Sequence, residues 1–221
     1  MAELAIVLTG GHSSRMGRDK AALTRDGRSQ LDRTLAACSA CSVIVVAGPK
    51  PPGNPAPGPD EARDSSGSDD GSSRPATVPA QVRQVSEDPP FGGPVAGIAA
   101  AVDALSSASD SDRVLVLAVD LVDPQGAVAL LTGAADGPDG VCLIDAEGFR
   151  QGLAARYRVG SLRSALAAVN QVRHCSVRRL IAPLALANVS AGDLADDVDT
   201  PDQARRRGFD ALPATAKRPS A

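Results

Sequence analysis

The chain has 221 residues, a formal net charge of −3 and a pI of about 5.4, with 43% hydrophobic but only 2% aromatic residues. This length fits one α/β domain. The acidic balance and the scarcity of aromatic rings argue against a nucleic-acid-binding protein, which is usually basic and often stacks bases on exposed rings.

No apolar run approaches the roughly 20 residues that span a bilayer. The first residues lack the basic and long apolar regions of a secretory signal. We therefore expect a cytosolic (cytoplasmic) protein with no membrane partner. Its four cysteines are then expected to stay reduced.

Two of these cysteines, Cys38 and Cys41, form a C-x-x-C pair. This spacing occurs in redox pairs and as half of a zinc site, but the sequence has no second such pair. We interpret both as small residues of the Ala-rich stretch 35–42.

The first half of the chain begins with an apolar run at residues 4–8, which Gly10 and Gly11 stop. Such a run is typical of a strand buried on both faces of a parallel sheet. A Gly- and Ser-rich loop follows. The pattern then predicts a helix over 29–41 and a second strand over 43–46.

Between residues 49 and 80 the composition changes to Pro, Gly, Ser and Asp, with almost no large apolar residue. Such a segment cannot bury enough surface to offset its chain entropy. We predict a disordered insertion. It has no cluster of positive charge and no apolar anchor, so we favour a solvated surface loop over a functional lid.

The second half alternates strands and helices again, which predicts a three-layer α/β/α sandwich with a mostly parallel, Rossmann-like sheet. We expect a single domain over residues 1–210 and a flexible tail over 211–221. Strands are predicted at 82–85, 114–119, 141–144, 153–157 and 184–189, and helices at 95–105, from Pro124, at 161–169 and at 201–207.

The most informative segment follows the first strand and reads LTGGHSSRMGRDK over residues 8–20. Open α/β sheets bind ligands at the carboxyl ends of their strands. Gly10 and Gly11 allow the backbone to approach a ligand closely, and its N–H groups can then cradle phosphate oxygens. Arg15 and Lys20 add full charges. The spacing differs from both common phosphate-binding loops, so a plain surface turn is the alternative.

Asp120 ends the clearest strand of the chain. A carboxylate there is well placed to hold Mg²⁺, which prefers oxygen ligands together with substrate phosphates. The alternative is a turn or helix-capping aspartate, and Asp123 before Pro124 fits that role better.

The segment 8–20 as a whole is similar to the signature of the molybdenum cofactor guanylyltransferase (MobA-like) family, L-A-G-G-x-S-x-R-M-G-x-D-K. Thr9 stands where Ala is usual, and every other fixed position matches. Sugar-phosphate nucleotidyltransferases instead resemble L-A-A-G-x-G-T-R-M followed by Pro-Lys. Asp19, which precedes Lys20 where that pattern has Pro, therefore favours the molybdopterin branch.

Three later segments fall in the order that this family requires. Residues 87–88 and 93–97, Glu-Asp and GPVAG, resemble its E-D and G-P-L-A-G. Residues 119–120 resemble the strand end that carries its metal-binding aspartate, and residues 197–201, DVDTP, resemble its N-[IV]-[ND]-T-P segment.

The resemblance implies a nucleotidyltransferase that moves GMP from GTP to the phosphate of molybdopterin, or of the molybdenum cofactor, and releases pyrophosphate. It implies Mg²⁺ as the cofactor, held by Asp120. The implied protein partners are molybdoenzymes or proteins of cofactor biosynthesis. The implied catalytic residues are Arg15, Lys20 and Asp120, and the implied nucleotide-binding residues are Leu8, Thr9, Gly10, Gly11, Lys20, Asp88 and Asp120.

The sequence also departs from the family. Asp120 is followed by LVDP rather than by a small or apolar residue and Pro, and residues 46–48 read VAG where some members have Asn. Asp199 fits a second metal or pterin contact as well as a helix cap. His12 has no assigned role, and His174 is expected at the surface.

Three other functions stay open. One is a cytidylyltransferase that acts on the same pterin, and another is a nucleotidyltransferase with a different small phosphorylated substrate. The third is a nucleotide-binding regulator that keeps the fold without turnover.

We predict that deletion of residues 49–79 leaves nucleotidyl transfer largely intact, because the segment lacks the apolar residues that packing requires. Shortening such a loop changes its closure entropy only logarithmically. Pyrophosphate release by the purified deletion variant is the measurement. A soluble but inactive variant would show that the insertion takes part in the reaction.

Overall fold

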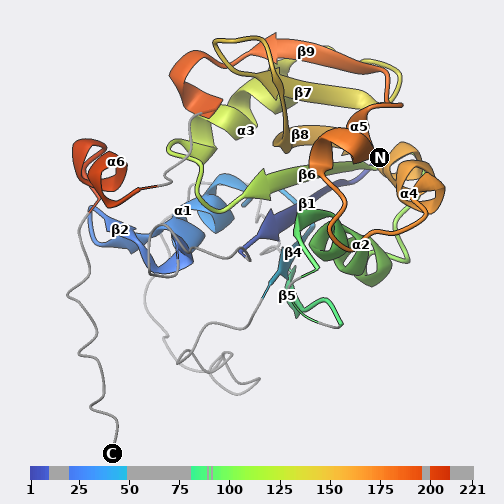
Figure 1. Cartoon of the computed structure of the whole chain (residues 1–221), viewed down its shortest axis with the longest axis horizontal. Helices are drawn as coiled ribbons and strands as arrows, with labels where there is room; N and C mark the ends of the chain where they lie inside the picture. The colour runs from blue at the N-terminus through green and yellow to red at the C-terminus, as the bar shows by residue number, and fades with distance from the viewer. Residues whose placement is uncertain (10–19, 49–80, 89, 91, 196–199, 210–221) are drawn as a thin grey trace, which may run out of the picture.

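The computed structural model describes residues 1–9, 20–48, 81–88, 90, 92–195 and 200–209. Its central feature is a seven-stranded sheet with the order β5-β4-β1-β6-β8-β7-β9 (Figure 1). These strands are β1 Glu3–Leu8, β4 Val43–Ala47, β5 Gln81–Val85, β6 Arg113–Ala118, β7 Gly140–Ile144, β8 Arg150–Arg158 and β9 Leu186–Ser190.

The sheet is parallel except at β8, which runs antiparallel to both of its neighbours, β6 and β7. Helices cover both faces. The predicted three-layer α/β fold with a mostly parallel sheet is therefore confirmed. The predicted insertion at 49–80 and the predicted tail lie outside the described residues.

Alternate residues of the central strands pack into two separate hydrophobic cores, one on each face of the sheet. Ile6 of β1 and Val116 of β6 lie in one core, and Val7 and Leu117 lie in the other. Because both faces of these strands are buried, their sequences read as continuous apolar runs rather than as alternating ones. This is why the central strands could be predicted from their apolar runs in the sequence.

The first core is closed by α2 Pro94–Ala104, α4 Val159–Ala168 and α5 Val177–Ile181. The second is closed by α1 Gln30–Ala37 and α3 Pro124–Gly133. A third, small cluster holds α6 Pro201–Arg206 through Ala204 and Phe209, which contact Leu23 and Val122. No helix in the described part of the chain combines the length and hydropathy needed to cross a membrane.

Several short elements were not predicted. They are α5, the hairpin of β2 Thr24–Arg25 and β3 Arg28–Ser29, and the 3₁₀ turns η1 Lys20–Ala22 and η2 Gly192–Ala195. The helix predicted over 29–41 is also shorter than expected, because Ser29 is the N-cap of α1 and Cys38 its C-cap.

The C-x-x-C cysteines are buried free thiols in the second core. A hydrogen bond with the Cys41 thiol, together with burial, raises the pKa of the Cys38 thiol. Because the thiolate is the reactive form, this environment opposes redox chemistry. Both cysteines act here as small packing residues.

The amino-terminal end of β6 is fixed by an ion-pair network on the edge opposite Asp120. Asp136 accepts from Arg113 Nε at 2.6 Å and from Arg156 Nη1 at 3.3 Å, and Arg156 Nε donates to Glu3 at 3.0 Å. The Arg113 side chain is only 8% exposed, so its charge depends on this partner.

We predict that Asp136→Ala lowers the free energy of unfolding by about 2–3 kcal/mol, because it leaves a buried guanidinium unpaired. The matched control is Asp110→Ala. Asp110 pairs with Arg163 at 2.7 Å but is 76% exposed, so its loss should cost less than about 1 kcal/mol. Urea denaturation of both variants tests this, and equal losses would contradict it.

Candidate active site

The parallel pairing of β1 with β6 sets the position of the site. Leu8 is paired with Ala118 at the last residues of these strands, and Val119 N–H donates to the Leu8 carbonyl at 3.0 Å. The segments that follow the two strands therefore leave the sheet side by side, at its carboxyl edge.

The two sequence-predicted residues Lys20 and Asp120 meet at this edge. Lys20 Nζ donates to Asp120 Oδ2 at 2.7 Å, although the residues are 100 positions apart in the chain. Their side chains are 18% and 19% exposed. A cation and a carboxylate thus lie together, partly desolvated but within reach of a ligand from solvent.

The turn after Asp120 is held from one side by α1. Gln30 is fully buried, and its Nε2 donates to the Leu121 carbonyl at 2.7 Å. Arg33 donates to the Gln30 side chain at 3.2 Å and to the Val122 carbonyl at 3.3 Å. The LVDP departure from the family pattern therefore produces a turn whose carbonyls are tied to a neighbouring helix.

The other side of this turn is fixed by α3. Asp123 Oδ1 accepts from Gly126 N–H at 3.0 Å, which makes Asp123 the N-cap of the helix. The prediction that Asp123 caps a helix is confirmed, since Asp123 is the N-cap of α3.

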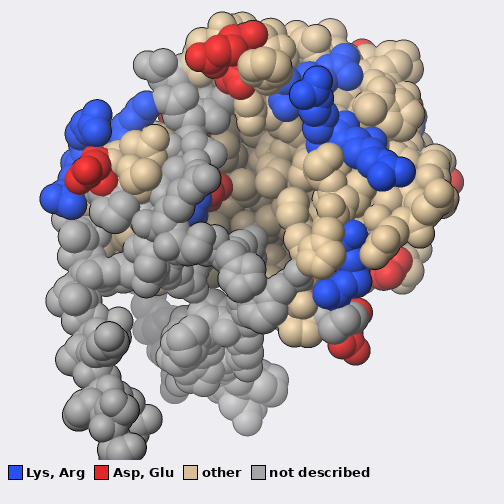
Figure 2. Space-filling view, viewed as in Figure 1, with Lys and Arg blue, Asp and Glu red and all other residues tan. Residues whose placement is uncertain are grey.

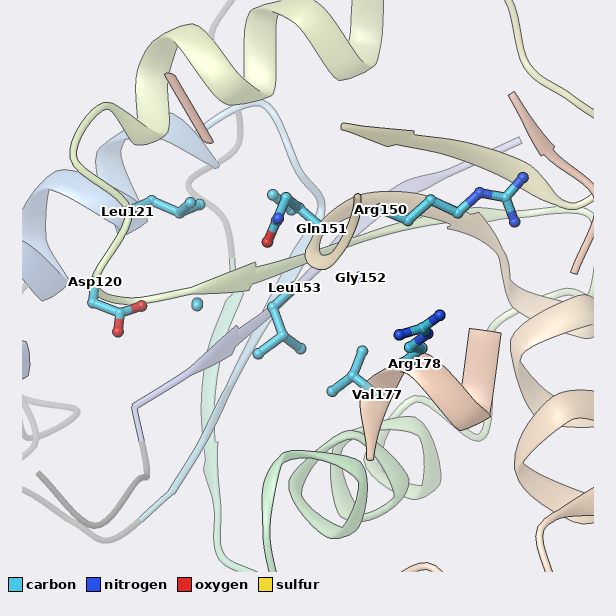
Figure 3. A pocket seen from close by; sticks show the side chains of 10 residues that line it. Asp120, Leu121, Arg150, Gln151, Gly152, Leu153, Val177 and Arg178 are labelled. Carbon is cyan, nitrogen blue, oxygen red and sulfur yellow. The ribbon is translucent and has the colours of Figure 1, made fainter. Parts of the chain in front are cut away.

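A pocket of about 270 Å³ opens beside Asp120 (Figure 3). Asp120 lies at one end, Arg150 and Arg178 lie toward the other, and Leu153 and Val177 lie between them. The lining comes from the end of β6, the start of β8 and α5, and consists of Ala118, Asp120, Leu121, Arg150, Gln151, Gly152, Leu153, Ala154, Val177 and Arg178.

Close packing at Gly152 brings α5 to the pocket. A Cβ atom on Gly152 would lie 2.5 Å from Val177 Cγ1 and 3.1 Å from Ile181 Cδ1. The Gly152 carbonyl also accepts from the buried Tyr157 hydroxyl at 2.8 Å. A residue without a side chain thus lets the short helix sit directly on β8.

The sequence did not predict Arg150, Gln151 or Arg178 as site residues. Arg150 and Gln151 begin a strand, and in a parallel sheet that would place them on the edge away from Asp120. The antiparallel direction of β8 puts them on the same edge instead. Arg178 was missed because α5 has only five residues, too few to show a helical pattern in the sequence.

The predicted nucleotide-binding residues are only partly within the described structure. Gly10, Gly11 and Arg15 lie outside it. The Leu8 side chain is buried in the first core, so it can offer a ligand only its backbone. Thr9 N–H donates to the Ala47 carbonyl at 2.9 Å, and its hydroxyl makes a longer bond of 3.4 Å to the same atom.

The segment after β5 reaches the same edge of the sheet. Asp88 is exposed there, while Glu87 accepts from Gly92 N–H at 2.8 Å and so fixes the approach to α2. Gly97 lets α2 pack closely on the sheet, because a Cβ at this position would lie 3.3 Å from Leu8 Cδ2. The glycine of this motif therefore has a packing role.

The last motif is described only from Thr200 onward. Thr200 is the N-cap of α6, and its hydroxyl accepts from Gln203 N–H at 3.2 Å. The helix cap is therefore Thr200 and not Asp199, which lies outside the described residues together with residues 197 and 198. His174 is exposed, as predicted.

The sequence matches the MobA-like NTP transferase domain over residues 5–189. The chain belongs to this family. The match spans most of the described sheet and includes both Lys20 and Asp120, so the MobA-like assignment covers the candidate site as well as the fold.

Crystal structures of two proteins share the fold. Molybdopterin-guanine dinucleotide biosynthesis protein A from Archaeoglobus fulgidus is 16% identical, with a TM-score of 0.54 over 93% of this chain and 96% of that one. The 2-C-methyl-D-erythritol 4-phosphate cytidylyltransferase from Thermus thermophilus is 20% identical, with a TM-score of 0.56 over 93% and 97%. No curated protein sequence is significantly similar to the chain.

We predict that Lys20→Ala lowers turnover about 10²–10³-fold, the usual loss when one contact to a developing charge is removed. The fold should persist, because Lys20 lies at the rim of the sheet and outside both cores. Arg28→Ala, at an exposed position on β3, is the matched control. Pyrophosphate release and thermal unfolding are the measurements, and full activity in a folded Lys20→Ala protein would refute the role of this residue.

Proposed function

We propose that this MobA-like nucleotidyltransferase transfers GMP from GTP to the phosphate of molybdopterin and releases pyrophosphate. The observation that carries the proposal is the Lys20–Asp120 pair at 2.7 Å, at the carboxyl edge of the sheet and beside a pocket large enough for part of an acceptor. The family resemblance of residues 8–20 supports the same assignment.

In the proposed reaction an oxygen of the acceptor phosphate attacks the α-phosphorus of GTP. The bond from that phosphorus to the bridging oxygen of the β-phosphate breaks, and pyrophosphate leaves with the electron pair. The nucleophile is already anionic, so the site needs no strong general base. Catalysis then depends on positioning and on neutralising charge, which Lys20 and Arg15 supply at the triphosphate.

Asp120 fits the Mg²⁺ ion that this chemistry commonly uses. In the described part of the chain no group of three or more His, Cys, Asp or Glu side chains gathers into a cage. A single carboxylate at a strand end matches the usual mode, in which Mg²⁺ is shared between one or two carboxylates, substrate phosphates and water. When bound there, the ion would neutralise phosphate oxygens, while Lys20 holds the carboxylate in place.

A cytidylyltransferase is the second candidate, because a protein with that activity shares the fold at a comparable TM-score. The doubled glycine at positions 10 and 11 favours guanine, since the resembled guanylyltransferases carry L-A-G-G there. The Thr9 hydroxyl bonds to the neighbouring strand at Ala47, so its polar group is engaged by the sheet.

We predict that kcat/KM with molybdopterin and Mg²⁺ is at least about 100-fold higher for GTP than for CTP. A site that hydrogen-bonds one base has unpaired polar groups when a different base is bound. The difference in kcat/KM between the two nucleotides is therefore large. The measurement is pyrophosphate release across a nucleotide panel. A ratio that favours CTP would establish the cytidylyltransferase, and nucleotide binding without turnover would establish the regulator.

A further inference from the structure

The pocket beside Asp120 has a second charged end. Figure 2 shows a hollow on this face, with Lys and Arg side chains gathered along one side of it over the region of α5. Arg150 and Arg178 are the cations that line the pocket itself. Their surroundings decide which of them can bind a ligand.

Arg150 is already engaged by the sheet edge. Its Nε donates to Asn188 Oδ1 at 2.9 Å, and its terminal nitrogens donate to the carbonyls of Leu184 and Leu186 at 3.4 and 3.3 Å. These contacts hold β8 to β9 and leave the guanidinium few donors for another partner. Arg150 therefore contributes mainly the wall of the pocket.

Arg178 is in a different position. It is exposed on α5, and in the described part of the chain no carboxylate or carbonyl binds its guanidinium. Arg178 lies across the pocket from Asp120, and Leu153 and Val177 lie between these two residues (Figure 3). Arg179, the next residue, is also exposed but does not line the pocket.

The lining thus has three chemical zones. One end carries Asp120, which accepts a hydrogen bond from Lys20 and is where the reacting phosphate belongs in the proposed function. The middle is formed by the apolar side chains of Leu153 and Val177 and by small residues at positions 152 and 154. The far end carries the exposed Arg178 guanidinium, whose charged N–H groups donate to oxygen acceptors.

We infer that Arg178 forms the far end of an acceptor subsite, where it hydrogen-bonds an oxygen that lies across a ring system from the reacting phosphate. The acceptor is then an elongated, phosphorylated and largely planar molecule held at both ends. This inference rests on the proposed function, and it assigns the acceptor to the pocket between β8 and α5. In a phosphorylated pterin, the ring carbonyl is an oxygen of the required kind.

The test compares Arg178→Gln with the matched neighbour Arg179→Gln. Both remove one exposed charge from α5, but only Arg178 lines the pocket. Arg178→Gln should lower kcat/KM for molybdopterin about tenfold, mainly through KM, since one charge-assisted hydrogen bond is lost. KM for GTP should stay within about twofold, and Arg179→Gln should match the wild type in every constant.

A second readout needs no turnover. Direct titration of wild type and both variants with molybdopterin, followed by pterin fluorescence, should show about tenfold weaker binding for Arg178→Gln alone. Equal effects of the two substitutions, or an effect on KM for GTP instead, would overturn the subsite. Arg178-dependent binding without pyrophosphate release would overturn the proposed reaction but keep the subsite. Wild-type protein that fails to bind molybdopterin would overturn both.

Discussion

The parallel register between β1 and β6 is the constraint on which the site depends. Because Leu8 pairs with Ala118, the chain that follows each strand emerges at the same point of the same edge. Lys20 Nζ lies 2.7 Å from Asp120 Oδ2 across 100 residues of sequence, and the neighbouring Ala21 is buried in the second core. A slip by one residue in either strand would exchange the two core faces and separate the pair, so the buried apolar patterns on both faces also protect the geometry of the site.

The surroundings of Asp120 show how a departure from the family pattern is accommodated. Instead of the usual short turn, the segment after Asp120 is tied to α1 through the buried Gln30 and to α3 through the Asp123 cap. A buried amide without a partner is costly, so Gln30 and the Leu121 carbonyl stabilise each other. The Asp120 carboxylate is therefore presented by a turn that is tied to two helices, and in the proposed reaction this would preorganise its charge.

Much of this structure could be predicted from the sequence, for identifiable reasons. Runs such as residues 4–8 and 114–118 are apolar on both faces, which is a strong signal for central strands. Lys20 and Asp120 both come after such strands and were predicted as site residues, but their direct contact is shown only by the structure. The five-residue α5 is too short to show a helical period, and the direction of β8 leaves no local mark in its sequence. The pocket residues Arg150 and Arg178 were missed for these two reasons.

Under the proposed function, β8 and α5 separate acceptor choice from reaction chemistry. In the proposed reaction, the residues that handle phosphate come from the first 20 residues and the end of β6, whereas the far part of the pocket comes from β8 and α5, after position 149. Since β8 is reversed, its first residues reach the reaction edge without any change to the β1–β6 register. Substitutions there can reshape the acceptor pocket while Lys20 and Asp120 keep their contact. One fold can in this way carry one reaction with several acceptors, and the fold alone does not decide which acceptor is used.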